Sequence, residues 1–399
     1  MESQINGVAS PSSADLSSPT TITTTTTTTA NPQNPINRAT NPMQSWWEAV
    51  SRSRSRIHSL SSIVPFGDDA IAPLADSDCP ARSLLGNPSA TSALSSALRL
   101  PSSGSGDDAL CQWIYETYLS TDADLRLVVL SFVPLISGLY LSRVVSAAAS
   151  PSLAGFESVL LAFYNAEARS RSGKPVLVSV PDLSYPSLYH SPPSSKSSRP
   201  PSMNEWKPSI GVLSPPLEPQ IGVKSTKRAC VVAVALDCFY KKISLMPATS
   251  KLDLCEFASA WAGQNCPCQT DLDEDDDEVG FVSKEMGKLR VCEEKCGSGS
   301  GSRIPFPWEL MQPVLRILGH CLLAPLNPQE VRDAASAAVR CMYARALHDL
   351  MPQAILAARS LIQLDRRARS ASAIVLANVS SNPNTPSKQR KPDVLLASK

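Results

Sequence analysis

The sequence has few of the residues and motifs that enzymes depend on. Its 399 residues include only four histidines. It contains no G-x-S-x-G element, P-loop, H-E-x-x-H motif, kinase glycine-rich loop or dinucleotide-binding fingerprint. The absence of these motifs argues against the hydrolases, nucleotide-binding enzymes and zinc proteases that use them. We therefore predict a protein that is not an enzyme and that needs no cofactor.

The sequence also lacks an excess of charge of one sign and a recognisable membrane address. The formal net charge is +1 and the pI is near 7.5, so no global field attracts nucleic acid or anionic lipid. The N-terminus MESQINGVAS has neither a basic region nor an apolar region of a secretory signal. No glycine follows Met1 and no prenylation box ends the chain. We expect a cytosolic protein with no lipid anchor of its own and no nucleic-acid partner.

One segment, LRLVVLSFVPLISGLYL, has the hydrophobicity of a membrane span but not its length. Only 16 uncharged residues lie between Arg126 and Arg143, and Pro134 is among them. A spanning helix needs about 20 apolar residues. The segment is therefore predicted to be a central core helix with a kink at Pro134.

Composition divides the chain into folded and low-complexity parts. The 34 prolines cluster with serine, and Thr23 to Thr29 are seven consecutive threonines. Such segments bury too little apolar surface to offset the entropy lost on ordering. The predicted organisation is a disordered region over 1–42, a mostly disordered region with one short amphipathic helix over 43–106, a helical domain over 107–369 with disordered inserts at about 191–224 and 269–301, and a disordered tail over 370–399.

Within 107–369 the apolar residues follow helical spacing. Asp108 is predicted to cap a first helix and Asp122 or Asp124 a second one. In the third helix Phe163 shares an apolar stripe with Phe156, so we expect it to be buried. PVLVSVPDL is rich in β-branched residues and is bounded by prolines, which indicates one short extended segment. The predicted fold class is all-α: a single domain of stacked helical hairpins with one short extended segment.

Cysteine spacing raises a zinc hypothesis. Cys266 and Cys268 are followed by Cys292 and Cys296, and four thiolates can hold a tetrahedral zinc. The first pair is too closely spaced and an acidic run separates the pairs, so free thiols are favoured and no metal is predicted. A small zinc-dependent regulatory protein nevertheless stays open as an alternative. His320 and His348 fall near predicted helix C-termini, where the helix dipole favours positive charge.

The two ends of the chain carry features that suit a lipid surface. Trp46 and Trp47 precede the basic SRSRSR segment, which either forms an interfacial helix or packs loosely on the core. The three arginines of that segment are weak support for RNA binding. Near the other end lies a basic cluster that either contacts phospholipid headgroups or merely completes a helix C-terminus, formed by Arg366, Arg367, Arg369, Lys388, Arg390 and Lys391. An independent peripheral lipid-binding adaptor is therefore an alternative function.

Several segments, taken in order, resemble the hyccin family. The four main pieces are LSFVPLISGLYL (130–141), GFESVLLAFYNAEA (155–168), VPDLSYPSLYH (180–190) and SRIP (302–305). Supporting similarity continues in CFYKKISLMP (238–247) and LMPQAILAARSLIQL (350–364). The resemblance covers roughly residues 108–365, and it is the collinear set rather than any single motif that is specific.

The resemblance implies a non-catalytic role. Hyccins are helical accessory subunits of the type III alpha phosphatidylinositol 4-kinase complex, which pack against a tetratricopeptide-repeat scaffold subunit. An EFR-type palmitoylated anchor tethers that assembly to the plasma membrane, where the kinase supplies phosphatidylinositol 4-phosphate. By this resemblance we expect the chain in the cytosol and, through its partners, as a peripheral protein on the cytoplasmic face of the plasma membrane.

A partner-facing surface is predicted within residues 183–190. Tyrosine is amphipathic and suits protein interfaces. The candidate interface residues are Leu183, Tyr185, Leu188, Tyr189 and His190. The alternative is that this segment only covers an edge of the helical core.

Overall fold

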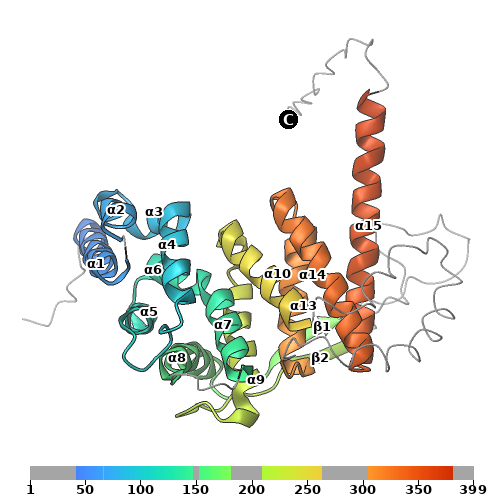
Figure 1. The fold of residues 1–399 in the computed structure, drawn as a ribbon, viewed down its shortest axis with the longest axis horizontal. Coiled ribbons are helices and arrows are strands. Elements are labelled where there is room, and N and C mark those ends of the chain that lie inside the picture. Colours follow the sequence, from blue (N-terminus) through green and yellow to red (C-terminus); the bar gives the residue numbers. More distant parts are fainter. Residues whose placement is uncertain (1–41, 66, 147–151, 181–208, 263–303, 381–399) are drawn as a thin grey trace, which may run out of the picture. The chain divides into compact units, whose positions relative to one another are not determined.

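The structure is a computed structural model that describes residues 42–65, 67–146, 152–180, 209–262 and 304–380. The chain divides into two compact units, Met1–Ser45 and Trp46–Lys399, and nearly all of the described residues lie in the second. Its described part is almost entirely helical (Figure 1). The predicted all-α class is confirmed.

Ordered helices begin well before residue 107. They are α1 (Pro42–Ile63), α2 (Gly67–Ala70), the 3₁₀ helix η1 (Ala72–Asp76), α3 (Pro80–Gly86) and α4 (Pro88–Arg99). Leu60, Leu84 and Leu98 of this region are buried in the common core. The expectation that 43–106 is mostly disordered is therefore wrong. The helices are short and carry alanine or threonine at many core positions, so their hydrophobic pattern is weak in sequence.

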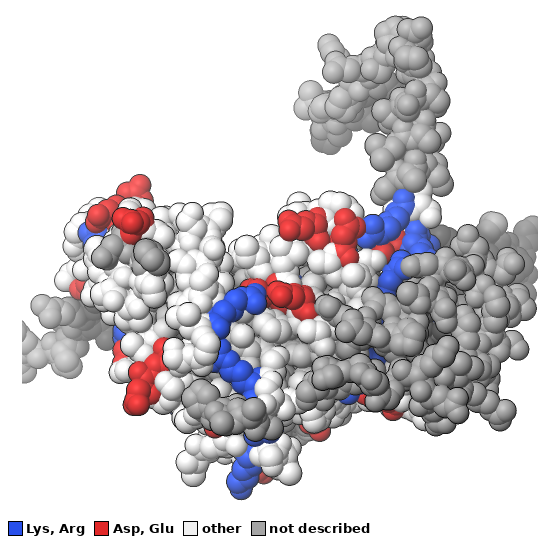
Figure 2. Space-filling model, in the orientation of Figure 1, with Lys and Arg blue, Asp and Glu red and all other residues white. Residues whose placement is uncertain are grey.

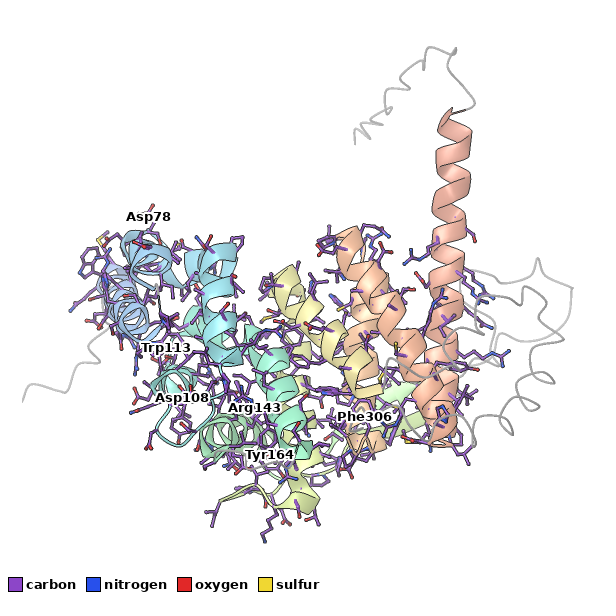
Figure 3. All side chains as sticks on the ribbon, viewed as in Figure 1. Asp78, Asp108, Trp113, Arg143, Tyr164 and Phe306 are labelled. Carbon is purple, nitrogen blue, oxygen red and sulfur yellow. The ribbon has the colours of Figure 1, made fainter. Side chains whose placement is uncertain are left out.

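The basic segment of α1 is part of the core packing. Arg56 pairs with Glu116 at 2.8 Å, and the indole of Trp113 donates to the Arg56 carbonyl at 2.9 Å (Figure 3). Ser53 donates to Asp122 at 2.5 Å. These contacts tie α1 to α5 (Ala109–Leu119) and to the start of α6 (Ala123–Ser131), so the helix packs on the core and its arginines serve structural contacts.

Three apolar helices follow: α5 (Ala109–Leu119), α6 (Ala123–Ser131) and α7 (Val133–Val145). Asp108 and Asp122 cap α5 and α6 through their carboxylates, as predicted. The expected single kinked helix is instead two helices that meet at Phe132, because Pro134 has no N–H to donate and blocks the preceding turn.

One stretch of the described residues, Ala123–Val145, is long and apolar enough to cross a membrane. Of the apolar 18-residue window within it, 72% is buried inside the protein. That burial is typical of a core helix, and Leu135, Ile136 and Tyr140 are among the most buried residues. The stretch is weak support for a membrane span.

An antiparallel two-stranded ribbon follows α8 (Ala154–Arg171). Its strands are β1 (Val176–Val180) and β2 (Ser209–Ser214), with Leu177 opposite Val212. β1 lies in the extended segment predicted from the sequence. β2 falls inside the predicted disordered insert 191–224, so that prediction is wrong for residues 209–224. Only Ile210 and Val212 alternate here, among prolines and serines, and this pattern is too short to predict a strand.

The remaining helices pack both on sequence neighbours and on helices further along the chain. They are α9 (Arg228–Tyr240), α10 (Ala248–Ala262), α13 (Trp308–Leu323), α14 (Gln329–His348) and α15 (Pro352–Ser380). α14 packs on α10, α13 and α15, α9 packs on α8 and α13, and α7 joins α10 to the earlier helices. The helix α15 continues to Ser380, so the predicted tail begins too early.

Candidate functional site

The sites predicted from the sequence fall outside the described residues. The partner-surface candidates Leu183, Tyr185, Leu188, Tyr189 and His190 lie in 181–208, and the zinc candidates Cys266, Cys268, Cys292 and Cys296 lie in 263–303. Both predictions therefore stay predictions. Within the described ranges no group of His, Cys, Asp or Glu could hold a metal ion.

Burial makes several of the described cysteines poor nucleophiles. Most are buried, and burial raises the pKa of Cys238 to about 12. Burial, the Asp108 charge and a hydrogen bond to Asp108 also raise the pKa of Cys111. A thiol with a raised pKa holds little thiolate at neutral pH, and the thiolate is the reactive form. Cys111 and Cys238 therefore act as small core residues.

The two histidines do lie in the last turns of α13 and α14. Burial and the nearby Lys251 charge lower the pKa of His320. The lowered pKa disfavours the charged form of His320, so burial and the Lys251 charge oppose the predicted interaction of a positive charge with the helix dipole. The buried Lys251 ammonium donates to Asn327 at 2.8 Å, and Asn327 in turn donates to the last carbonyls of α13.

A network of ion pairs fixes the ribbon to the helices. Arg171 donates to Glu167 at 2.7 Å and to the Ser214 hydroxyl at 2.7 Å, while Lys241 also pairs with Glu167. Burial alone raises the pKa of Glu167, but the hydrogen bonds from Lys241 and Arg171 outweigh it and lower that pKa. Nearby, Asp237 pairs with Arg316 at 2.9 Å. These charges join α8, α9 and β2, and we assign them a structural role.

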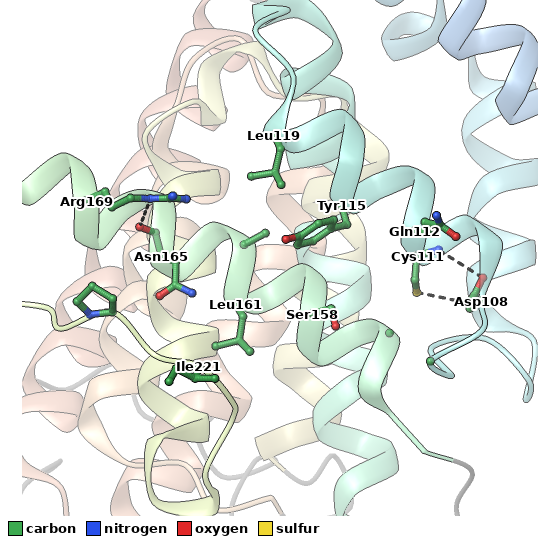
Figure 4. A pocket seen from close by; sticks show the side chains of 14 residues that line it. Asp108, Cys111, Gln112, Tyr115, Leu119, Ser158, Leu161, Asn165, Arg169 and Ile221 are labelled. Atoms are coloured by element: carbon green, nitrogen blue, oxygen red, sulfur yellow. Dashed lines mark hydrogen bonds between the residues drawn. The ribbon is translucent and has the colours of Figure 1, made fainter.

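A shallow groove of about 670 Å³ lies between α5, α8 and the connection from β2 to α9 (Figure 4). Tyr115 and Leu119 line it from α5, Leu161 and Arg169 from α8, and Ile221 from the connection. Its lining mixes apolar and polar side chains and contains no histidine or lysine. The groove is suited to contact rather than to reaction.

The connection from β2 to α9 is held firmly on α8. Asn165 donates to the Gln220 carbonyl at 2.8 Å, and the Gln220 amide donates back to the Asn165 side chain at 2.9 Å. Leu217 is buried in the core. Directly after this fixed point Ile221 is 105% exposed. The prediction of a disordered insert over 191–224 therefore missed the buried Leu217 and the hydrogen-bonded Gln220.

The ribbon exposes apolar side chains on both faces. Leu177, Ile210 and Val212 share one face and are all more than half exposed, and Val178 and Val180 are exposed on the other face. A two-stranded ribbon is marginally stable alone, and exposed apolar side chains of this density mark interaction surfaces. The ribbon is therefore an apolar candidate contact surface.

The structure describes only part of the two terminal features that the sequence suggested for a lipid surface. Trp46 and Trp47 are 53% and 59% exposed, with ring centroids 6.1 Å apart. Arg369 pairs with Asp333 and Asp365, each at 2.8 Å, so its charge is largely compensated. Lys388, Arg390 and Lys391 lie outside the described residues. The face shown in Figure 2 is mostly uncharged, with separate small groups of acidic and of basic side chains.

Comparison with known families identifies most of this chain. The model of the Hyccin family matches residues 75–391 of the 399 residues. The match begins before α3 and so includes helices that the sequence comparison over 108–365 left out. It also extends beyond the described end of α15.

Proposed function

Because the chain belongs to the hyccin family, we propose that it is a non-catalytic accessory subunit that helps to assemble a phosphatidylinositol 4-kinase complex and to recruit it to the plasma membrane. Its partners in this proposal are a tetratricopeptide-repeat scaffold subunit, the type III alpha kinase and, through the complex, an EFR-type anchor. The observation that supports the proposal most strongly is the family match over residues 75–391.

The side-chain chemistry of the described residues agrees with an accessory role. Several of their buried charges are paired, such as Arg171 with Glu167, and burial raises the pKa of the Cys111 and Cys238 thiols. The exposed ribbon residues Leu177, Ile210 and Val212 offer an apolar surface that a helical-repeat scaffold can cover.

Membrane recruitment through partners fits the weak charge of the chain. A net charge of +1 provides little attraction to anionic lipid, and stable attachment of a peripheral protein usually needs two signals. In this proposal the anchor subunit supplies the main attachment, and the chain resides in the cytosol and on the cytoplasmic face of the plasma membrane.

Affinity purification of the full-length chain from native membranes, followed by quantitative mass spectrometry, tests the proposed assembly. The scaffold, the kinase and the anchor are expected at comparable abundance. Recovery of the chain without the scaffold and the kinase would contradict it. Depleting the scaffold or the anchor should release the chain to the cytosol.

One observation favours a second candidate, an independent lipid-binding adaptor. Trp46 and Trp47 are both more than half exposed, and tryptophan partitions well into membrane interfaces. Flotation of the purified chain with liposomes separates the two functions. Strong binding that Trp46→Ser and Trp47→Ser abolish, together with no recovery of kinase subunits, would favour the adaptor.

A further inference from the structure

We propose that residues 221–227, which we name the α9 entry loop, contact an anionic lipid bilayer directly. The inference rests on the proposed function for its cellular setting, because a subunit of a membrane-recruited complex works close to such a surface. The loop combines a fully exposed aliphatic tip, two lysines that form no ion pair with a described residue, and attachment to the core at both ends.

The loop presents an apolar tip. Ile221 is 105% exposed, and a Cβ placed on the neighbouring Gly222 would meet no atom within 4 Å. No described side chain therefore covers the tip. An isoleucine in this position can enter the interfacial region of a bilayer and so leave water.

The loop is also positively charged. Lys224 and Lys227 are exposed, and neither forms an ion pair with a described residue. Glu218 is the only acidic residue between Ser214 and Asp237. Arg169 of α8 lines the same groove as Ile221 and adds positive charge nearby. Figure 2 shows basic side chains at the lower tip of the view, where α9 begins in Figure 1.

The two ends of the loop are fixed to the helical core. The paired hydrogen bonds between Gln220 and Asn165 hold the first end. At the other end Arg228 donates to the Tyr140 hydroxyl at 2.9 Å. Between them a 3₁₀ turn brings the Lys227 amide to the Lys224 carbonyl at 2.9 Å. The lysines and Ile221 are therefore presented together without folding of the loop on binding.

The residue types favour lipid over a protein partner. Lysine is depleted at the centres of protein interfaces, where arginine and aromatic residues are enriched. Lysine heads on flexible stems reach toward headgroups at varying positions while the stems cover apolar surface. Each lysine near an anionic bilayer strengthens partition by about fivefold, and a shallowly inserted isoleucine by about tenfold.

Flotation of the purified full-length chain tests the loop, using phosphatidylcholine vesicles with and without phosphatidylserine. The variant Lys224→Gln/Lys227→Gln should reduce partition on the anionic vesicles by roughly 25-fold, and Ile221→Ser by roughly tenfold. Lys242→Gln, which removes an exposed lysine just beyond the far end of α9, and Leu326→Ser, which changes another fully exposed aliphatic residue, should bind as the wild type does.

Three results would overturn the proposal. The first is wild-type binding that shows no preference for anionic vesicles. The second is unchanged flotation of the loop variants, including the case in which only Trp46→Ser/Trp47→Ser loses binding. The third is normal flotation of the loop variants with loss of the scaffold on co-purification, which would make the loop a protein contact.

The same experiments distinguish failure of the kinase-complex role from failure of the lipid contact. If the wild-type chain co-purifies with neither scaffold nor kinase yet floats with loop-dependent preference for anionic vesicles, the lipid contact stands and the kinase-complex role is contradicted. Circular dichroism of each variant should match the wild type, because every substituted side chain is exposed.

Discussion

Replacing Phe163 should cost a large part of the stability of the helical unit. Phe163 on α8 is 0% exposed, and its ring centroid lies 4.3 Å from that of Tyr118 on α5. Truncation of a buried phenylalanine to alanine costs about 3–5 kcal/mol, against roughly 5–15 kcal/mol for a typical domain. Phe163→Asp should cost more, because it also buries a charge that has no partner in this apolar contact.

Urea denaturation of the full-length chain, followed by far-ultraviolet circular dichroism, measures these changes. Phe163→Ala should lower the midpoint strongly and Phe163→Asp should abolish cooperative unfolding or solubility. Leu326→Ala is the control, because Leu326 is 96% exposed and should change stability by less than about 0.5 kcal/mol. A soluble Phe163→Asp variant that unfolds cooperatively at the wild-type midpoint would refute the packing described for α5 and α8.

Further predictions concern the charges, the close contacts and the metal content. The pKa of Glu167 is lower in the folded protein than its unfolded value, near 4.5. Its ion pairs therefore stabilise the fold above pH 4.5, and this stabilisation is lost as the pH falls through the folded pKa. Glu167→Gln should remove this part of the acid sensitivity, measured as the urea midpoint at each pH. Arg143 donates to the carbonyls of Ser103 and Leu100, so Arg143→Ala should lower the unfolding free energy by about 1.5–3 kcal/mol, and an unchanged urea midpoint would refute this. Gly138→Ala should cost about 1–3 kcal/mol, because the added Cβ would overlap the Phe257 ring; a wild-type melting temperature would contradict the contact. Metal analysis of the purified chain should find no stoichiometric zinc, and a chelator should leave the helical circular dichroism unchanged.

The sequence predicted the strongly patterned helices well. Asp108 and Asp122 stand directly before apolar residues at helical spacing, so both the caps and the helices follow from local physics. The burial of Phe163 follows from the same pattern. The end of α15 was harder to place, because the basic residues around Arg367 resemble a helix C-terminus although the helix continues to Ser380.

The helices before residue 107 and the strand β2 were missed because their order comes from tertiary contacts. Arg56 reaches Glu116 and Trp113 reaches the Arg56 carbonyl across 57 or more positions of sequence, which no local pattern reveals. β2 is held by pairing with β1 and by the bond from Arg171 to Ser214. The exposure of Ile221 likewise depends on the anchoring of its neighbour on α8.

The proposed function requires that this chain support recruitment of a phosphatidylinositol 4-kinase. The most direct test is the amount of the kinase at the plasma membrane in cells that lack the chain, measured beside cells in which the full-length chain is restored. We predict that plasma-membrane kinase falls without the chain, that phosphatidylinositol 4-phosphate falls with it, and that restoration recovers both. Unchanged kinase localisation in the absence of the chain would contradict the claim.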